Sequence, residues 1–158
     1  MIKKIAVFLP FILFLNADIY ASENQSTVLI TGSNRNIGFE FVKQFANKEW
    51  RVIATTRSLE SADDLIKFSK ENKNVIVEQL DITNDEHLQF LKKKYKNEPI
   101  DILLNNAAYT PRYLSSFRGI DGVEVDATRK SFEVNTIGTM KVIQTFIDNV
   151  EESNNGKI

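Results

Sequence analysis

The chain has 158 residues, of which 42% are hydrophobic and 26% are charged, as in an ordinary globular protein. A formal net charge of -1 gives no reason to expect nucleic acid as a partner. The sequence has no cysteine, which excludes a disulfide framework and a thiolate nucleophile, and its one histidine, His87, is expected on the surface. We therefore expect no metal site.

The amino terminus resembles a secretory signal peptide. Two lysines precede an apolar run from Ile5 to Leu15, and a polar segment then ends in small residues at Ala21 and Ser22. This order predicts cleavage after Ala21, so that residues 1–21 are removed and the protein is periplasmic or secreted. The run is short for a bilayer span and contains Pro10. A membrane anchor and a cytoplasmic location are the alternatives.

From Thr27 onwards, strand and helix patterns alternate. Strands are expected at residues 27–30, 51–55, 75–80 and 100–104. A helix follows the first strand, and further helices are expected at about 60–70, 81–95 (capped near Thr83 or Asn84) and 126–150. Short apolar strands that alternate with helices indicate a doubly wound parallel sheet, and right-handed crossovers give the strand order 3-2-1-4. We therefore expect one α/β, Rossmann-like domain over residues 22–158.

A loop with two glycines joins the first strand to the first helix. A tight glycine turn before a helix can bind a pyrophosphate, because its N–H groups and the positive end of the helix dipole face the anion. The candidate cofactor-binding residues of this loop are Gly32, Ser33, Asn34, Arg35, Asn36, Ile37 and Gly38.

Four separated segments together resemble the short-chain dehydrogenases/reductases, and within them the single-domain carbonyl reductases. These segments are Thr31–Gly38, Leu80–Thr83, Asn105–Ala108 and Val134–Gly138, and the resemblance extends from about Ser26 to the last residue. It implies an oxidoreductase that uses a nicotinamide cofactor on a small carbonyl or alcohol substrate. The chain departs from the family pattern at Asn36 and Ala108, where the family usually has glycine. Asparagine tolerates left-handed backbone, so the turn is expected to survive.

The end of the second strand indicates which cofactor is used. NAD sites generally place a carboxylate there, whereas this chain has Thr56 and Arg57. Arg57 and Arg35 could bind a 2′-phosphate, so we expect NADP rather than NAD. Alternatively, Arg57 is simply a solvated residue.

The other two cofactor segments follow the third and fourth strands. The resemblance implies that Asp81 accepts a hydrogen bond from the adenine amino group, with Ile82 beside the ring. Asp81 could also cap the following helix. Asn106, Ala107 and Ala108 are implied to lie against the ribose and diphosphate, although an asparagine pair at a strand end is also common in turns.

The family reduces its substrates with a serine and a Tyr-x-x-x-Lys motif, and this sequence contains neither in the expected place. Gly156-Lys157-Ile158 resembles the opening of the family's fifth strand, so we expect a domain that is truncated before that strand. Asn135 is the only match to the catalytic set. It is implied to bend its helix and hold a water, or it is an ordinary polar helix residue.

We therefore expect the cofactor-binding portion of an NADP-dependent reductase, inactive by itself. A dinucleotide-binding sensor or interaction protein, or a decayed fragment, is the alternative. An exposed fourth strand and long helix would make the chain marginally stable and prone to form homo-oligomers through the helix at 126–150.

Overall fold

The computed structural model describes residues 25–111 and 119–158. The predicted signal peptide at 1–21 lies outside these residues. Within the two described ranges, no helix is both long and apolar enough to cross a membrane.

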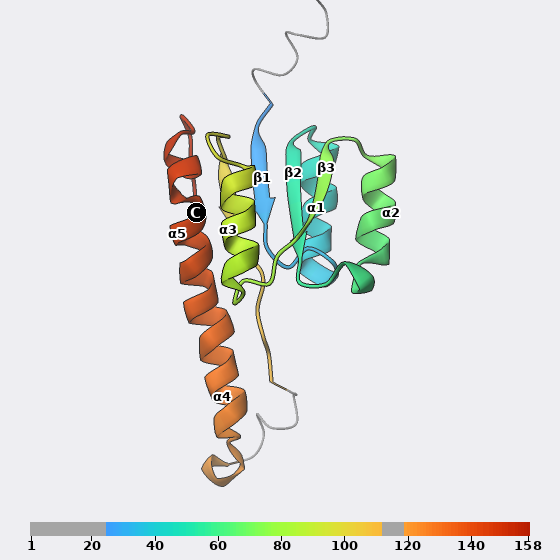
Figure 1. The fold of residues 1–158 in the computed structure, drawn as a ribbon. Helices are drawn as coiled ribbons and strands as arrows, with labels where there is room; N and C mark the ends of the chain where they lie inside the picture. The colour runs from blue at the N-terminus through green and yellow to red at the C-terminus, as the bar shows by residue number, and fades with distance from the viewer. Residues whose placement is uncertain (1–24, 112–118) are drawn as a thin grey trace, which may run out of the picture.

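A parallel sheet of four strands forms the centre of the domain (Figure 1). The strands are β1 (Thr27–Ile30), β2 (Arg51–Thr56), β3 (Val75–Gln79) and β4 (Ile102–Leu104). Their order is β3-β2-β1-β4, and Ile30 of β1 lies opposite both Ala54 and Leu104. The predicted strand order is therefore confirmed.

Helices cover both faces of this sheet. The covering helices are α1 (Asn36–Asn47), α2 (Asp63–Glu71), α3 (Asp85–Lys94) and α5 (Thr139–Glu151). A further helix, α4 (Val125–Phe132), has no buried residue, and η1 (Leu59–Ser61) and η3 (Ile120–Gly122) are short 3-10 turns. A π-helical turn, η4 (Glu133–Gly138), joins α4 to α5 in one long helix. Figure 1 shows α4 extending beyond the end of the sheet at which the strands finish.

The sheet separates two hydrophobic cores. Val42 of α1 and Leu65 of α2 are fully buried on one face, and Leu91 of α3 and Phe146 of α5 are fully buried on the other. Burying such a side chain contributes about 1.5–3 kcal/mol. Both faces of the strands are therefore apolar, which explains why their sequences are nearly continuous hydrophobic runs.

The structure corrects one helix prediction and adds a detail to another helix. The second helix begins at Asp63, because Leu59–Ser61 form a separate 3-10 turn. Ile37 is apolar and lies in the first turn of α1, but 68% of it is exposed. The buried side of α1 consists of Gly38, Val42 and Ala46, four residues apart, and Ile37 points away from this line.

The outer edge of β4 was expected to be unpaired, and at one position it is not. Lys157 forms a parallel bridge with Ile102. The N–H of Leu103 donates to the Lys157 carbonyl, and the N–H of Lys157 donates to the Asp101 carbonyl, both over 2.9 Å. The segment that resembles the opening of a fifth strand thus lies beside β4, where such a strand would pair.

Candidate functional site

The glycine loop needs both of its glycines. Gly32 has a φ of +68°, and a Cβ added to it would lie 2.8 Å from the Cα of Ala107. A Cβ added to Gly38 would lie 2.6 Å from the side-chain nitrogen of Asn106 and would also collide with the carbonyl oxygen of Gly32. Only glycine allows the loop, the first turn of α1 and the segment after β4 to approach this closely.

Asn36 adopts the left-handed backbone that we expected, with a φ of +50°. It is the first residue of α1, and Arg35 at the N-cap provides no side-chain hydrogen bond. The first turn also contains no acidic residue. The amino-terminal N–H groups of α1 therefore lack a capping side chain, which leaves them available to an anion.

Asn106 and Thr31 fasten the segment after β4 to the glycine loop. The side-chain amide of Asn106 donates to the carbonyls of Thr31 (3.0 Å) and Gly32 (2.9 Å). The hydroxyl oxygen of Thr31 accepts the N–H groups of Asn106 and Ala107, both over 3.0 Å. Both amide hydrogens of Asn106 are thus used within the protein, so this side chain supports the loop and has none left to donate to a ligand.

Ser33 and Thr56 were predicted to contact the cofactor, but their donors are also used internally. Ser33 is fully buried; its hydroxyl donates to Ile30 and its N–H to Thr55, both over 2.8 Å. The buried Thr56 donates its hydroxyl to the Ser58 carbonyl over 3.1 Å. These side chains therefore shape the loop and the end of β2, and their contact with a cofactor stays a prediction.

The other residues predicted to bind the cofactor differ in how far their side chains are exposed to solvent. The side chain of Asn34 donates to the carbonyl of Ser61 over 3.2 Å, which ties the glycine loop to η1. Arg35, Arg57 and Ala108 are exposed. The two guanidinium groups are therefore free to meet a ligand from solvent.

Asp81 lies just after β3, and only one of its two carboxylate oxygens accepts a hydrogen bond from the described residues. Its Oδ1 accepts the N–H (2.9 Å) and the hydroxyl (2.7 Å) of Thr83, whereas no described residue donates to Oδ2. Partial burial acts to raise the pKa of Asp81, but these bonds and the nearby Arg57 and His87 outweigh it and leave the pKa below its ordinary value. The cap of α3 is Asn84, so the predicted capping role of Asp81 is wrong.

Ile82 lies in the core, with 5% of it exposed. A Cβ added to Gly138 of the long helix would lie 2.9 Å from the Ile82 Cγ1 atom. The side chain therefore anchors the turn after β3 against this helix. The predicted place of Ile82 beside the adenine ring stays a prediction.

Asn135 belongs to the π-helical turn η4 and holds the backbone of Tyr109. Its Oδ1 accepts the Tyr109 N–H over 2.7 Å, and its Nδ2 donates to the Tyr109 carbonyl over 2.9 Å and to Ser131 Oγ over 3.1 Å. The helix has π-helical winding over Glu133–Gly138. The contacts give this residue a structural task, namely positioning the segment that follows Ala108.

His87 is a residue of this site that the sequence analysis missed. Its Nδ1 accepts the backbone N–H of Asp81 over 3.1 Å, and the residue is partly buried and not simply on the surface. The sequence gives no sign of this bond, because the partner, Asp81, lies six residues earlier, in the turn before α3.

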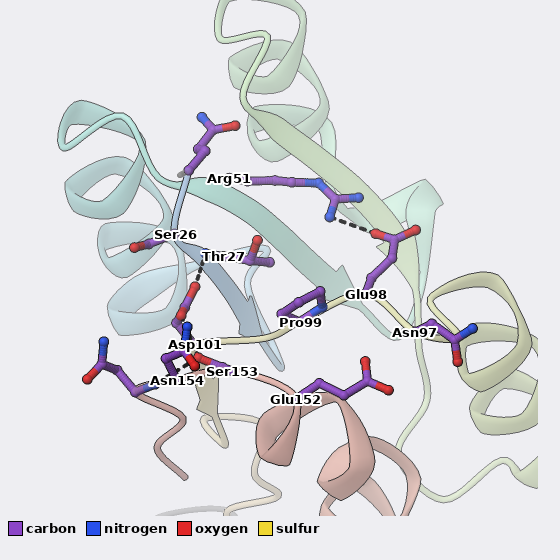
Figure 2. A pocket seen from close by; sticks show the side chains of 12 residues that line it. Ser26, Thr27, Arg51, Asn97, Glu98, Pro99, Asp101, Glu152, Ser153 and Asn154 are labelled. Carbon is purple, nitrogen blue, oxygen red and sulfur yellow. Dashed lines mark hydrogen bonds and ion pairs between the residues drawn. The ribbon is translucent and has the colours of Figure 1, made fainter. Parts of the chain in front are cut away.

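A hollow of about 670 Å³ lies away from the glycine loop, at the end of the sheet where the strands begin (Figure 2). Its polar groups already bind one another: Arg51 pairs with Glu98 over 2.7 Å, and Asp101 accepts from Thr27 (2.7 Å) and Ser153 (2.6 Å). Within residues 25–111 and 119–158 there is also no group of three His, Asp or Glu residues that could hold a metal. The glycine loop at the carboxyl ends of the strands is therefore the better candidate.

Comparison with known proteins agrees with this geometry. The family described as "short chain dehydrogenase" matches residues 26–158. Oxidoreductase BOA17 of Botryotinia fuckeliana is 31% identical over 132 residues, which are 82% of this chain and 46% of that protein. Salutaridine reductase of Papaver bracteatum is 33% identical over 119 residues, or 70% of this chain and 33% of that protein.

Solved structures share the fold. Carbonyl reductase from chicken fatty liver, with NADPH bound, gives a TM-score of 0.69 at 24% identity, over 81% of this chain and 49% of that one. Carbonyl reductase Sniffer of D. melanogaster gives 0.70 at 22% identity, over 82% of this chain and 53% of that one. The chain thus spans about half or less of the relatives it matches. Its loop, its strand order and the match over residues 26–158 show that it belongs to the short-chain dehydrogenase family.

Proposed function

We propose that this chain binds NADP(H) at the glycine loop and supplies the cofactor-binding part of a reductase for carbonyl or alcohol substrates. The observation on which this depends is the uncapped amino terminus of α1, which begins next to Arg35 behind a loop with two left-handed residues, Gly32 and Asn36. A diphosphate placed there would receive backbone N–H groups and the positive end of the helix dipole.

The choice of NADP over NAD depends on the end of β2. Thr56 is buried and Arg57 is exposed, and neither offers the carboxylate that usually binds a ribose 2′-hydroxyl. Arg57 and Arg35 present two guanidinium groups, each able to bind a phosphate with two hydrogen bonds. The positive charge of Arg57 also lowers the pKa of the nearby Asp81, so Arg57 interacts with this carboxylate as well as with a phosphate. We therefore assign Arg35 an independent part in binding the 2′-phosphate.

Each remaining segment has a proposed task. The free Oδ2 of Asp81 accepts from the adenine amino group, and the backbone of Ile82 borders the ring. Ala107 and Ala108 border the ribose and diphosphate, and Asn106 keeps the loop in shape. The bound nicotinamide would supply the hydride. Asn135 positions the chain after Ala108.

We further propose that reduction requires residues that this sequence does not contain. The family's Tyr-x-x-x-Lys motif is absent from the 158 residues, and the chain spans 46% or less of the two relatives named above. A nucleotide-binding protein without catalysis is the second candidate, favoured by the same absence. A serine and Tyr-x-x-x-Lys encoded in frame after Ile158 would favour the reductase.

Nucleotide titration tests the binding proposal. We expect NADPH to bind more tightly than NADH, measured by nucleotide fluorescence. Arg57→Gln should weaken NADPH binding about tenfold or more, because a charge-assisted bond is worth about 1.5–3 kcal/mol, and should leave NADH binding nearly unchanged. Lys96→Gln removes one positive charge at an exposed residue beyond α3 and is the matched control, with no expected effect.

Two results would contradict the proposal. Undetectable binding of both nucleotides would refute the assignment of the glycine loop. Equal affinities for NADPH and NADH, unchanged in Arg57→Gln, would refute the roles of Arg35 and Arg57 only.

A further inference from the structure

The turn between β3 and α3 is held from two sides. Asp81 Oδ1 binds Thr83, and the Asp81 N–H donates to His87 Nδ1 over 3.1 Å. The backbone of His87 is itself fixed, because Asn84 Oδ1 accepts the backbone N–H of His87 over 3.1 Å at the start of α3. The imidazole therefore bonds directly to the backbone of the residue whose carboxylate faces the proposed adenine position.

The hydrogen bond requires one form of the imidazole. A ring nitrogen that accepts an N–H must be unprotonated, so His87 is neutral here with its proton on Nε2. When the ring gains a second proton, Nδ1 becomes a donor that faces another donor, and the bond to Asp81 is lost. Histidine side chains gain this proton between about pH 8 and pH 5.

We propose that His87 is a positioning residue of the nucleotide site, which holds Asp81 for the adenine only while its ring is neutral. This inference rests on the proposed function. Protonation has two effects in the same direction: the backbone of Asp81 is released, and a positive ring competes with the adenine amino group for the carboxylate. Acidification should therefore weaken nucleotide binding.

Charged groups from several elements face this turn. Arg57 at the end of β2 acts on the charge of Asp81, and His87 does so only when its ring is protonated. On α3 itself, Asp85 and Glu86 occupy the first turn, and Asp85 is paired with Lys141 of α5 over 2.9 Å. Asp85 thus has a cationic partner on the other helix, whereas Glu86 is exposed and Asp81 bonds directly to His87 through its backbone.

Two substitutions separate the hydrogen bond from the titration. In His87→Asn, the side-chain oxygen can take the place of Nδ1 and accept the Asp81 N–H at every pH. In His87→Leu there is no acceptor. We would measure NADP⁺ affinity of the full chain by calorimetry between about pH 5.5 and pH 8 for all three proteins.

We expect wild type to lose about threefold to tenfold more affinity than His87→Asn on acidification, as for the loss of one hydrogen bond. His87→Leu should bind weakly at every pH. The 2′-phosphate of NADP⁺ titrates in the same range, but its contribution is common to all three proteins and cancels in the ratio. Identical pH profiles of wild type and His87→Asn would overturn the proposal.

A readout without nucleotide tests the same contact. In ¹⁵N-labelled protein, the Asp81 amide signal of wild type should shift along the titration of the His87 ring, and in His87→Asn it should not. An Asp81 amide signal that does not shift when the His87 ring is protonated would overturn the inference. If no variant binds NADP⁺ at about pH 8, the proposed function fails and the nucleotide part of this inference fails with it, while the amide signal still decides whether His87 controls the turn.

Discussion

At the scale of single residues, close backbone approach decides the geometry of the site. Gly32, Gly38 and Ala107 meet where the loop after β1, the start of α1 and the segment after β4 converge. Asn106 then bonds to the carbonyls of Thr31 and Gly32. The shape of the loop depends on these contacts more than on any side chain that points to solvent.

Gly38→Ala should therefore destabilise the protein and abolish nucleotide binding. The added methyl group would meet Asn106 Nδ2 at 2.6 Å and the backbone of Gly32, which must move apart. We expect a loss of about 1–3 kcal/mol in the free energy of unfolding, measured with urea. Gly119→Ala is the control, since nothing lies within 4 Å of its added Cβ, and it should change stability by less than about 0.5 kcal/mol. Equal effects of the two substitutions would show that the close approach is unimportant.

At the scale of elements, a buried polar contact joins α3 to the edge strand β3. Glu78 of β3 is 7% exposed and accepts hydrogen bonds from the Tyr95 hydroxyl (2.6 Å) and Lys94 (2.5 Å). Burial, followed by the bond to the Glu78 carboxylate, raises the pKa of Tyr95 far above its ordinary value. The contact therefore keeps Tyr95 protonated in the folded protein.

This shift predicts a loss of stability in alkali. The unfolded chain releases the Tyr95 proton above about pH 10 while the folded protein keeps it, so the contribution is complete below about pH 10 and falls as the pH rises further. Tyr95→Phe should remove this part of the pH dependence and cost about 1–3 kcal/mol at pH 7, because Glu78 loses a donor. The free energy of unfolding, measured with urea at pH 7 and above about pH 10, tests both expectations.

Tyr109→Phe serves as the control for this substitution. The bonds of Tyr109 to Asn135 use only its backbone, so removing its hydroxyl should leave the alkaline profile unchanged. An unchanged alkaline profile in Tyr95→Phe would contradict the assigned role of the buried hydroxyl.

At the scale of the whole molecule, the long helix presents an apolar stripe that the domain does not cover. Val125, Phe132 and Met140 are 61%, 61% and 48% exposed, and they recur every seven or eight residues along α4, η4 and α5. No residue of α4 is buried. Exposed apolar stripes of this kind commonly become protein interfaces.

We therefore predict that the chain self-associates through this helix and that Phe132→Glu prevents it. Light scattering after gel filtration should show an oligomer for wild type and a monomer for Phe132→Glu. Phe90→Glu is the matched control, because Phe90 on α3 is 62% exposed but lies outside the stripe, so its variant should behave as wild type. A wild-type monomer, or equal masses for both variants, would contradict the prediction.

Particular residues show how far the sequence could be interpreted. The strand order followed from apolar runs and crossover handedness, and the left-handed backbone of Asn36 followed from its place in the loop. The internal bonds of Ser33 and Thr56 did not follow, because their acceptors are brought close by the turns at the strand ends. Hydrogen-bond partners are chosen by folding, and residue type alone leaves both solvent and backbone as candidates.

By itself, the sequence determined the α/β class, the parallel order of the strands and the position of the glycine loop, because periodicity and glycine spacing are local properties. The tertiary structure alone decided which side chains support the loop and which remain open. Asn106 and His87 contact backbone on other segments, whereas Arg35 and Arg57 stay exposed. The glycine loop is a candidate binding site only because the parallel sheet places the carboxyl ends of its four strands at the same end of the domain.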